Sequence, residues 1–177
     1  MGFSIADGTG GGTQATVTHD NRLETTARTS PRIAYISKDD GLSFTWSHAY
    51  DYDANDTILL VSNSSTTKNL SIHTIAVGTD TATRFTVHSP AYPTLAGTLV
   101  TGTNPNRTSG AVADAEAYGD ETGNTQGDII FNGMLIGTGT AIIAPEGSII
   151  LGYHDCIAVD FVTAGTMGTV TITGYYE

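Results

Sequence analysis

The chain has 177 residues, with 7 basic and 18 acidic side chains and a net charge of -11. This acidity argues against binding nucleic acid through the phosphate backbone, which requires clusters of Lys and Arg, and against binding anionic membrane surfaces. The length is sufficient for one self-supporting core, and the single cysteine, Cys156, excludes an internal disulfide and is expected to be a small buried apolar residue.

Residues 1–13 are too rich in glycine to hold a strand by themselves, and Phe3 and Ile5 are their only sizeable apolar residues. We therefore predict an N-terminal arm at 1–13, with Phe3 and Ile5 as its contact residues, and a single domain over 14–177.

Short segments rich in threonine and branched apolar residues follow the arm, separated by Asp, Asn, Gly and Pro, as is typical of β-strands. In chain order the predicted strands are 15–18, 22–27, 32–37, 43–47, 57–62, 70–77, 83–88, 97–103, 129–136, 140–143, 148–153, 157–162 and 168–177. Residues 110–127 have no core-facing pattern and predict one helical turn or an edge strand, followed by a loop. No segment shows the period of an amphipathic helix. The pattern predicts an all-β fold, a jelly-roll-like antiparallel β-sandwich with a glycine-rich N-terminal arm.

The last strand shows this pattern best, because Val170, Ile172 and Tyr176 alternate with outward-facing threonines. The same alternation in the other strands predicts the inward face of the sandwich. Its expected members are Leu59, Val61, Leu70, Ile72, Phe131, Leu135, Ile149, Leu151, Val159, Phe161, Val170 and Ile172.

The acidic run 51–56 resembles the start of a calcium loop, with oxygen-bearing side chains at its first, third and fifth positions. The match fails at the sixth position, where Asp56 replaces glycine, and at the twelfth, where Ser62 replaces glutamate. A solvated hairpin loop is the favoured interpretation. Calcium binding is the alternative, and its candidate ligands are Asp51, Asp53, Asn55 and Asp56.

A metal enzyme of the cupin type is a second alternative, since Gly139-x5-Pro145-x-Gly147 opens like a cupin motif. That motif then requires a histidine where this chain has Ile150, and His154 comes too late. No Gly-x-Ser-x-Gly elbow is present, and no nucleophile, base and orienting residue share a recognisable spacing. We therefore expect no enzymatic activity and no cofactor.

Exposed aromatic side chains provide a candidate binding function, because sugars stack on aromatic faces. The candidate glycan contacts are Trp46, Tyr92, Tyr118 and Tyr153. For Trp46, core packing is the favoured interpretation, since it shares a strand face with Phe44.

Several fragments of the chain are similar to a known family. They are Asp7-Gly-Thr-Gly10, Asn21-Arg-Leu23, Gly41-x-x-Phe44, Leu59-Leu-Val-Ser-Asn63, Gly97-Thr-x-Val-Thr101, Asn104-x-Asn106 and Gly174-Tyr-Tyr176. In this order they resemble small β-rich virion proteins of tailed bacteriophages. The resemblance implies a head decoration (cement) protein, a homotrimer that binds the major capsid protein on the outer capsid surface. A neck, tail or fibre position with a glycan-binding sandwich is the alternative, and the family supplies no catalytic residues.

Overall fold

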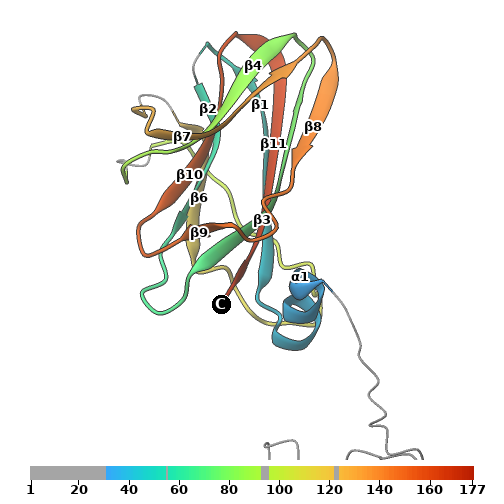
Figure 1. The fold of residues 1–177 in the computed structure, drawn as a ribbon, viewed down its shortest axis with the longest axis vertical. Coiled ribbons are helices and arrows are strands. Elements are labelled where there is room, and N and C mark those ends of the chain that lie inside the picture. Colours follow the sequence, from blue (N-terminus) through green and yellow to red (C-terminus); the bar gives the residue numbers. More distant parts are fainter. Residues whose placement is uncertain (1–30, 55, 93–95, 122–123) are drawn as a thin grey trace, which may run out of the picture. The chain divides into compact units, whose positions relative to one another are not determined.

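The computed structural model describes residues 31–54, 56–92, 96–121 and 124–177, which form a β-sandwich preceded by a short helical segment (Figure 1). The strands are β1 (Ser43–Tyr52), β2 (Asp56–Asn63), β3 (Leu70–Thr79), β4 (Thr83–Ser89), β5 (Thr98–Leu99), β6 (Ala115–Glu121), β7 (Asp128–Leu135), β8 (Gly139–Ile143), β9 (Ile149–Leu151), β10 (Cys156–Phe161) and β11 (Gly165–Tyr176). Some predictions fall outside the described residues. They are the arm at 1–13 with its residues Phe3 and Ile5, and the strands 15–18 and 22–27.

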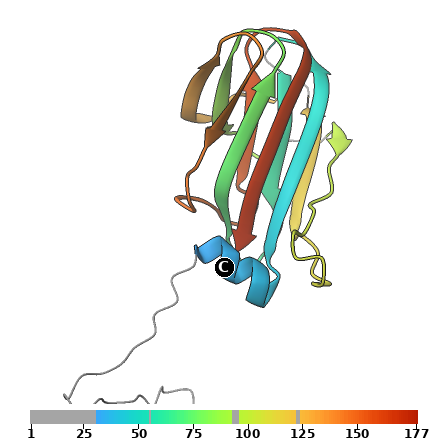
Figure 2. The ribbon, with the colours of Figure 1, turned by 90° about the vertical axis from the view of Figure 1, so that its right-hand side faces the viewer.

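The two sheets have the strand order of a jelly roll. One sheet runs β1-β11-β3-β8, with β9 also paired to β3, and the other runs β5-β6-β2-β10-β4-β7. Figure 2 shows the first sheet face-on. Without the inserted strands β5, β6 and β9, the chain crosses to the other sheet after every strand except between β4 and β7, which are neighbours in one sheet, as in two interlocked Greek keys. All the paired strands are antiparallel, so the predicted fold class is confirmed.

The core lies between the sheets and follows the predicted alternation. In β11, Val170 and Ile172 are fully buried, whereas Thr171 between them faces outward. Ten of the twelve predicted core residues are buried, namely Leu59, Val61, Leu70, Ile72, Leu135, Leu151, Val159, Phe161, Val170 and Ile172. Ile149 is half-buried and packs against the margin of this core.

The prediction for Phe131 was wrong, because its side chain is 41% exposed. Phe131 pairs with the buried Val87 and therefore has the inward parity that the alternation gives it. However, β7 is the last strand of its sheet, so no further strand covers its open side. Alternation predicts the direction of a side chain but not whether its strand lies at an edge.

The predicted strand 32–37 is helical instead. Residues Arg32–Tyr35 form α1 and residues Ile36–Asp40 form one π-helical turn. Gly41 ends this segment with a φ of 65° and donates its N–H to Ile36 O, which is a typical glycine C-cap. Ile36 is the one buried residue of the helical segment. The helical segment Arg32–Asp40 therefore packs Ile36 against one end of the sandwich and does not extend a sheet.

Two further segments differ in extent from the prediction. In the predicted strand 97–103, Thr98–Leu99 pairs with β6, and Thr103 forms an isolated bridge to Thr45. Residues 110–127 contain the regular strand β6, which pairs with β2 along most of its length.

The run 51–56 is not a hairpin, because it connects β1 in one sheet to β2 in the other. Among the described residues, no helix is long and apolar enough to cross a membrane.

Candidate functional site

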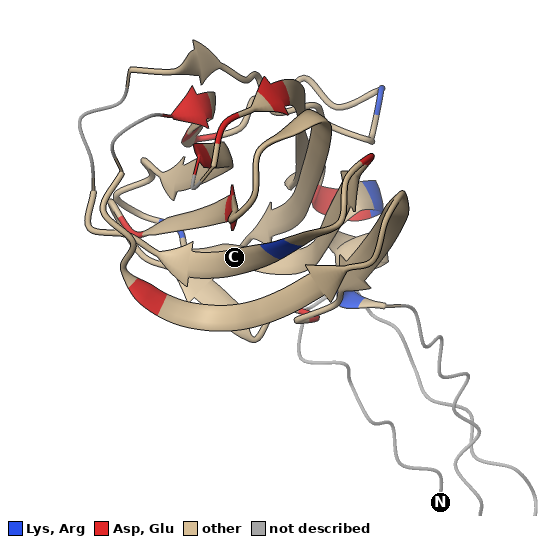
Figure 3. Ribbon diagram, turned by 90° about the horizontal axis from the view of Figure 1, so that it is seen from above, with Lys and Arg blue, Asp and Glu red and all other residues tan. Residues whose placement is uncertain are grey.

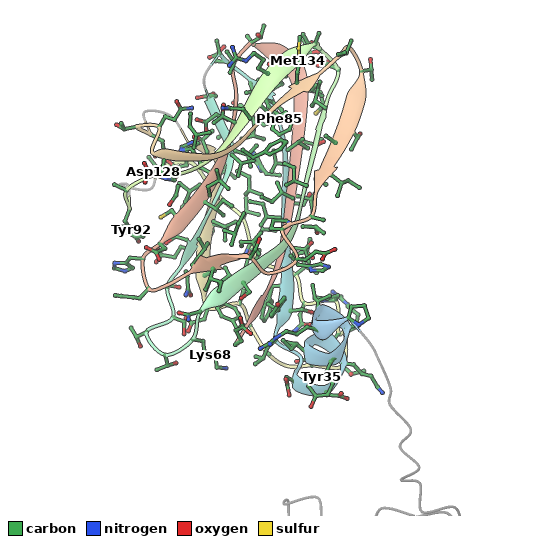
Figure 4. The ribbon with its side chains drawn as sticks, viewed as in Figure 1. Tyr35, Lys68, Phe85, Tyr92, Asp128 and Met134 are labelled. Atoms are coloured by element: carbon green, nitrogen blue, oxygen red, sulfur yellow. The ribbon has the colours of Figure 1, made fainter. Side chains whose placement is uncertain are left out.

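Three aromatic side chains stack on the surface beside the turn between β9 and β10. His154 lies 3.8 Å from Tyr153 and 4.3 Å from Tyr92 between ring centroids, with interplanar angles of 25° and 16°. Tyr92 and Tyr153 remain 42% and 54% exposed. We call these three residues the aromatic stack. It unites two predicted glycan contacts, and Figure 4 shows Tyr92 at the side of the sandwich.

The turn that carries Tyr153 and His154 is held by hydrogen bonds between its own residues and by one to Asn63. Gly152 donates its N–H to Asp155 Oδ2 at 2.9 Å, and Asp155 donates its N–H to Gly152 O at 3.0 Å. His154 has a φ of 65° and donates its N–H to Asn63 O at 2.8 Å. A positive φ is unfavourable for a residue other than glycine, so this turn retains some backbone strain.

Glu116 binds Tyr92, the member of the aromatic stack that lies outside the turn. The Tyr92 hydroxyl donates to Glu116 Oε2 at 2.6 Å, and this hydrogen bond to a carboxylate raises the pKa of Tyr92 to about 12. Tyr118, the third predicted contact, follows Glu116 by two residues on the same face of β6 and is half-buried. Sequence reasoning missed both Glu116 and His154, since neither belongs to a local motif.

Trp46 does not join this group. Its side chain is fully buried and packs 6.3 Å from the ring of Phe44, so its ring is not open to a sugar. The core-packing interpretation of Trp46 is therefore confirmed, and its role as an exposed glycan contact was wrong.

A second region lies at the opposite end of the sandwich from the β3–β4 turn, beside α1, and we call it the base. Asn104 donates its side-chain N–H to Gly41 O at 2.6 Å, and Asn106 donates to Ser37 O at 2.9 Å. The rings of Phe44 and Tyr176 meet edge to face at 5.8 Å. The segments 41–44, 104–106 and 174–176 therefore contact one another here although they lie far apart in the sequence.

Two surface grooves meet at the base and share Leu42, Lys68 and Tyr176. Arg32 and Tyr35 line one groove, and Arg32 also pairs with the carboxylate of Glu177. Burial raises the pKa of the Tyr176 phenol, whose hydroxyl has no hydrogen-bond partner among the described residues. Figure 4 shows Tyr35 and Lys68 at this end of the molecule.

A buried polar cluster lies on the outer side of the six-stranded sheet. Asp160 accepts a hydrogen bond from the Thr57 hydroxyl at 2.7 Å, and its second oxygen lies 2.8 Å from His88 Nε2 without a well-aligned hydrogen bond. His88 Nδ1 accepts the N–H of Gly127 at 3.2 Å. Because His88 has no exposed surface, this pair resembles part of a catalytic triad but is closed to a substrate.

The three calcium candidates that the structure describes, Asp51, Asp53 and Asp56, do not form a metal site. Asp51 and Asp53 are exposed, and Asn55 lies outside the described residues. Partial burial, followed by the nearby charge of Asp120, raises the pKa of Asp56. Across the described ranges, no group of three or more His, Cys, Asp or Glu side chains lies close enough to hold a metal ion.

Comparison of the chain with protein-family models, with curated proteins and with solved structures finds no match.

Proposed function

We propose that this protein is a structural component of a tailed-bacteriophage virion, a decoration (cement) protein that binds the major capsid protein on the outer surface of the head and acts as a homotrimer. The observation that carries the proposal is the base, where separate fragments resembling virion proteins come into contact. The helical segment that begins at Arg32 lies at this end of the sandwich. We infer that the base and residues 1–13 face the capsid.

The charge of the chain supports an external position. Along the described part of the chain, Asp and Glu outnumber Lys and Arg (Figure 3), and the whole chain has a net charge of -11. Like charge repels such a protein from packaged DNA. The proposal involves no catalytic step.

Co-sedimentation with heads of the phage whose genome carries this gene tests the proposal. We expect the full chain to sediment with the heads, and a chain lacking residues 1–13 to bind at least about tenfold more weakly while it keeps its β-rich circular dichroism spectrum. The matched variant Phe3→Ser/Ile5→Ser keeps the length and glycine content of the segment and should lose a similar share of binding. Failure of the full chain to bind heads contradicts the decoration function.

The aromatic stack favours a second candidate function, glycan binding by a neck, tail or fibre component. Two exposed tyrosine rings beside a carboxylate provide both a stacking surface and a hydrogen-bond acceptor for a sugar. On a glycan array, Tyr153→Ala should then abolish binding. Tyr35→Ala is the matched control, since Tyr35 is 55% exposed and lies in α1, away from the stack. Absence of any glycan signal from the full chain would eliminate this alternative.

A further inference from the structure

The aromatic stack has its histidine in the middle. Tyr153 and Tyr92 each stack on the His154 ring, with centroids 3.8 Å and 4.3 Å away and small interplanar angles. Two rings so close to a third ring cannot share one of its faces, so they cover opposite faces of His154. The open faces of the stack are therefore the outer faces of the two tyrosines, which are 54% and 42% exposed.

Both outer rings are held in place by the surrounding chain. His154 has a φ of 65°, in the left-handed region that residues other than glycine seldom adopt, and backbone strain of this kind clusters at ligand-binding surfaces. At the other end of the stack, the Tyr92 hydroxyl donates to Glu116. The stack therefore offers rigid, open aromatic faces, which bind a flat ligand face without first having to be ordered.

The charge around the stack indicates which sugars it suits. The segments that carry or contact it, 89–92, 114–118 and 152–156, contain three carboxylates, those of Asp114, Glu116 and Asp155, and no Lys or Arg. Lys68 lies at the base, away from Tyr92 (Figure 4). A negative field repels acidic sugars and attracts a protonated amine, and the face of a tyrosine ring attracts the same cation.

We propose that the aromatic stack is a binding site for amino sugars, that is, for sugar rings with a free protonated amine, in preference to N-acetylated and acidic sugars. The sugar ring stacks on the outer face of Tyr153, the more exposed tyrosine, and its ammonium group is attracted by Asp155 in the same turn. This inference rests on the glycan-binding candidate, which it deepens, and it does not depend on the decoration function.

NMR titration of the full chain with two trisaccharides tests the proposal. The chitosan trisaccharide has free amines, and the chitin trisaccharide has the same rings and linkages with the amines acetylated. At a pH that keeps the amines protonated, we expect the dissociation constant of the chitosan trisaccharide to be at least about fivefold lower. Tyr153→Ala should raise it at least about tenfold, whereas the control Tyr35→Ala, in α1, should leave it unchanged.

Asp155→Asn tests the role of charge. Asparagine keeps an oxygen that accepts the Gly152 N–H, so the turn is retained while one negative charge is removed. The variant should reduce the preference for the free amine at least about twofold and leave binding of the chitin trisaccharide unchanged. A preference that Asp155→Asn leaves unaltered would refute the role assigned to this carboxylate. Unfolding curves of all three variants verify that they remain folded.

The remaining outcomes separate this inference from the functions on which it does and does not rest. Equal or tighter binding of the chitin trisaccharide through Tyr153 would overturn the preference for amino sugars and leave the glycan-binding candidate in place. Absence of binding by either trisaccharide, or binding that Tyr153→Ala leaves intact, would overturn the site itself. Equally tight binding of an acyclic amine, such as the amide of N-acetyl-lysine, would also overturn it, because the sugar ring would then contribute nothing.

Discussion

Asp160 provides the sharpest test of the energetics of the fold. Asp160 is buried, and its carboxylate faces two donor groups, the Thr57 hydroxyl and the His88 ring. His88 Nδ1 accepts the Gly127 N–H, so the proton of a neutral ring is assigned to Nε2, which points toward Asp160. Asp160→Ala therefore leaves two buried donors without their acceptor.

Each buried donor left without a partner costs about 1–3 kcal/mol. The Thr57 hydroxyl can rotate and the His88 contact is poorly aligned, so we expect Asp160→Ala to lower the free energy of unfolding by about 2–4 kcal/mol. Asp160→Asn keeps an oxygen for His88 and offers an N–H to Thr57, and it should cost only about 1 kcal/mol.

Urea unfolding at pH 7, followed by circular dichroism, measures both variants, and the slope with urea should remain unchanged. A loss below about 1 kcal/mol for Asp160→Ala, or an equal loss for both variants, would refute the assigned roles of His88 and Thr57 in this cluster.

Three further predictions concern single side chains. Absorbance titration should give Tyr92 a pKa of about 12, and the variant Glu116→Gln should return this pKa toward its ordinary value of 10. Because the pKa of Tyr92 is raised in the folded state, its hydrogen bond to Glu116 stabilises the fold below pH 10, and this stabilisation is lost between pH 10 and 12. The variant Tyr92→Phe identifies which part of the absorbance signal belongs to Tyr92. Cys156 is fully buried and burial raises the pKa of its thiol, so a thiol reagent should label it only as fast as the protein opens, and rapid labelling without denaturant would contradict this burial. Gly102→Ala places a Cβ atom 2.6 Å from Trp46 Nε1 and should cost about 1–3 kcal/mol, whereas Gly110→Ala, with open space around it, should cost much less; equal unfolding midpoints would disprove the close contact.

The fold followed from the sequence wherever alternation alone decides the structure. Thr171 between Val170 and Ile172 is sufficient to orient β11, and the same rule oriented the buried residues of β2, β3 and β10. The position of a strand at the edge of its sheet could not be predicted in this way. Phe131 is exposed because its sheet ends at β7, which depends on the pairing of all the other strands.

The candidate site was predictable only in part, because its members come from distant segments. Composition indicated Tyr92 and Tyr153 as separate exposed aromatics, but their contact through His154 depends on how the turn after β9 meets the segment after β4. Glu121 provides a similar case, because an acidic side chain is ordinarily exposed to solvent. Its carboxylate is buried instead and accepts the N–H groups of Ala96 and Gly97. Such long-range partners have no local sequence signal.

The central claim is that this chain is a decoration protein that binds phage heads through its base and residues 1–13. The most direct measurement is cryo-electron microscopy of heads that lack this protein, before and after addition of the purified full chain. We expect additional density at regular positions on the outer head surface, into which the sandwich fits with α1 toward the shell. Heads that remain bare at saturating protein concentration, or density confined to the neck, tail or fibres, would contradict it.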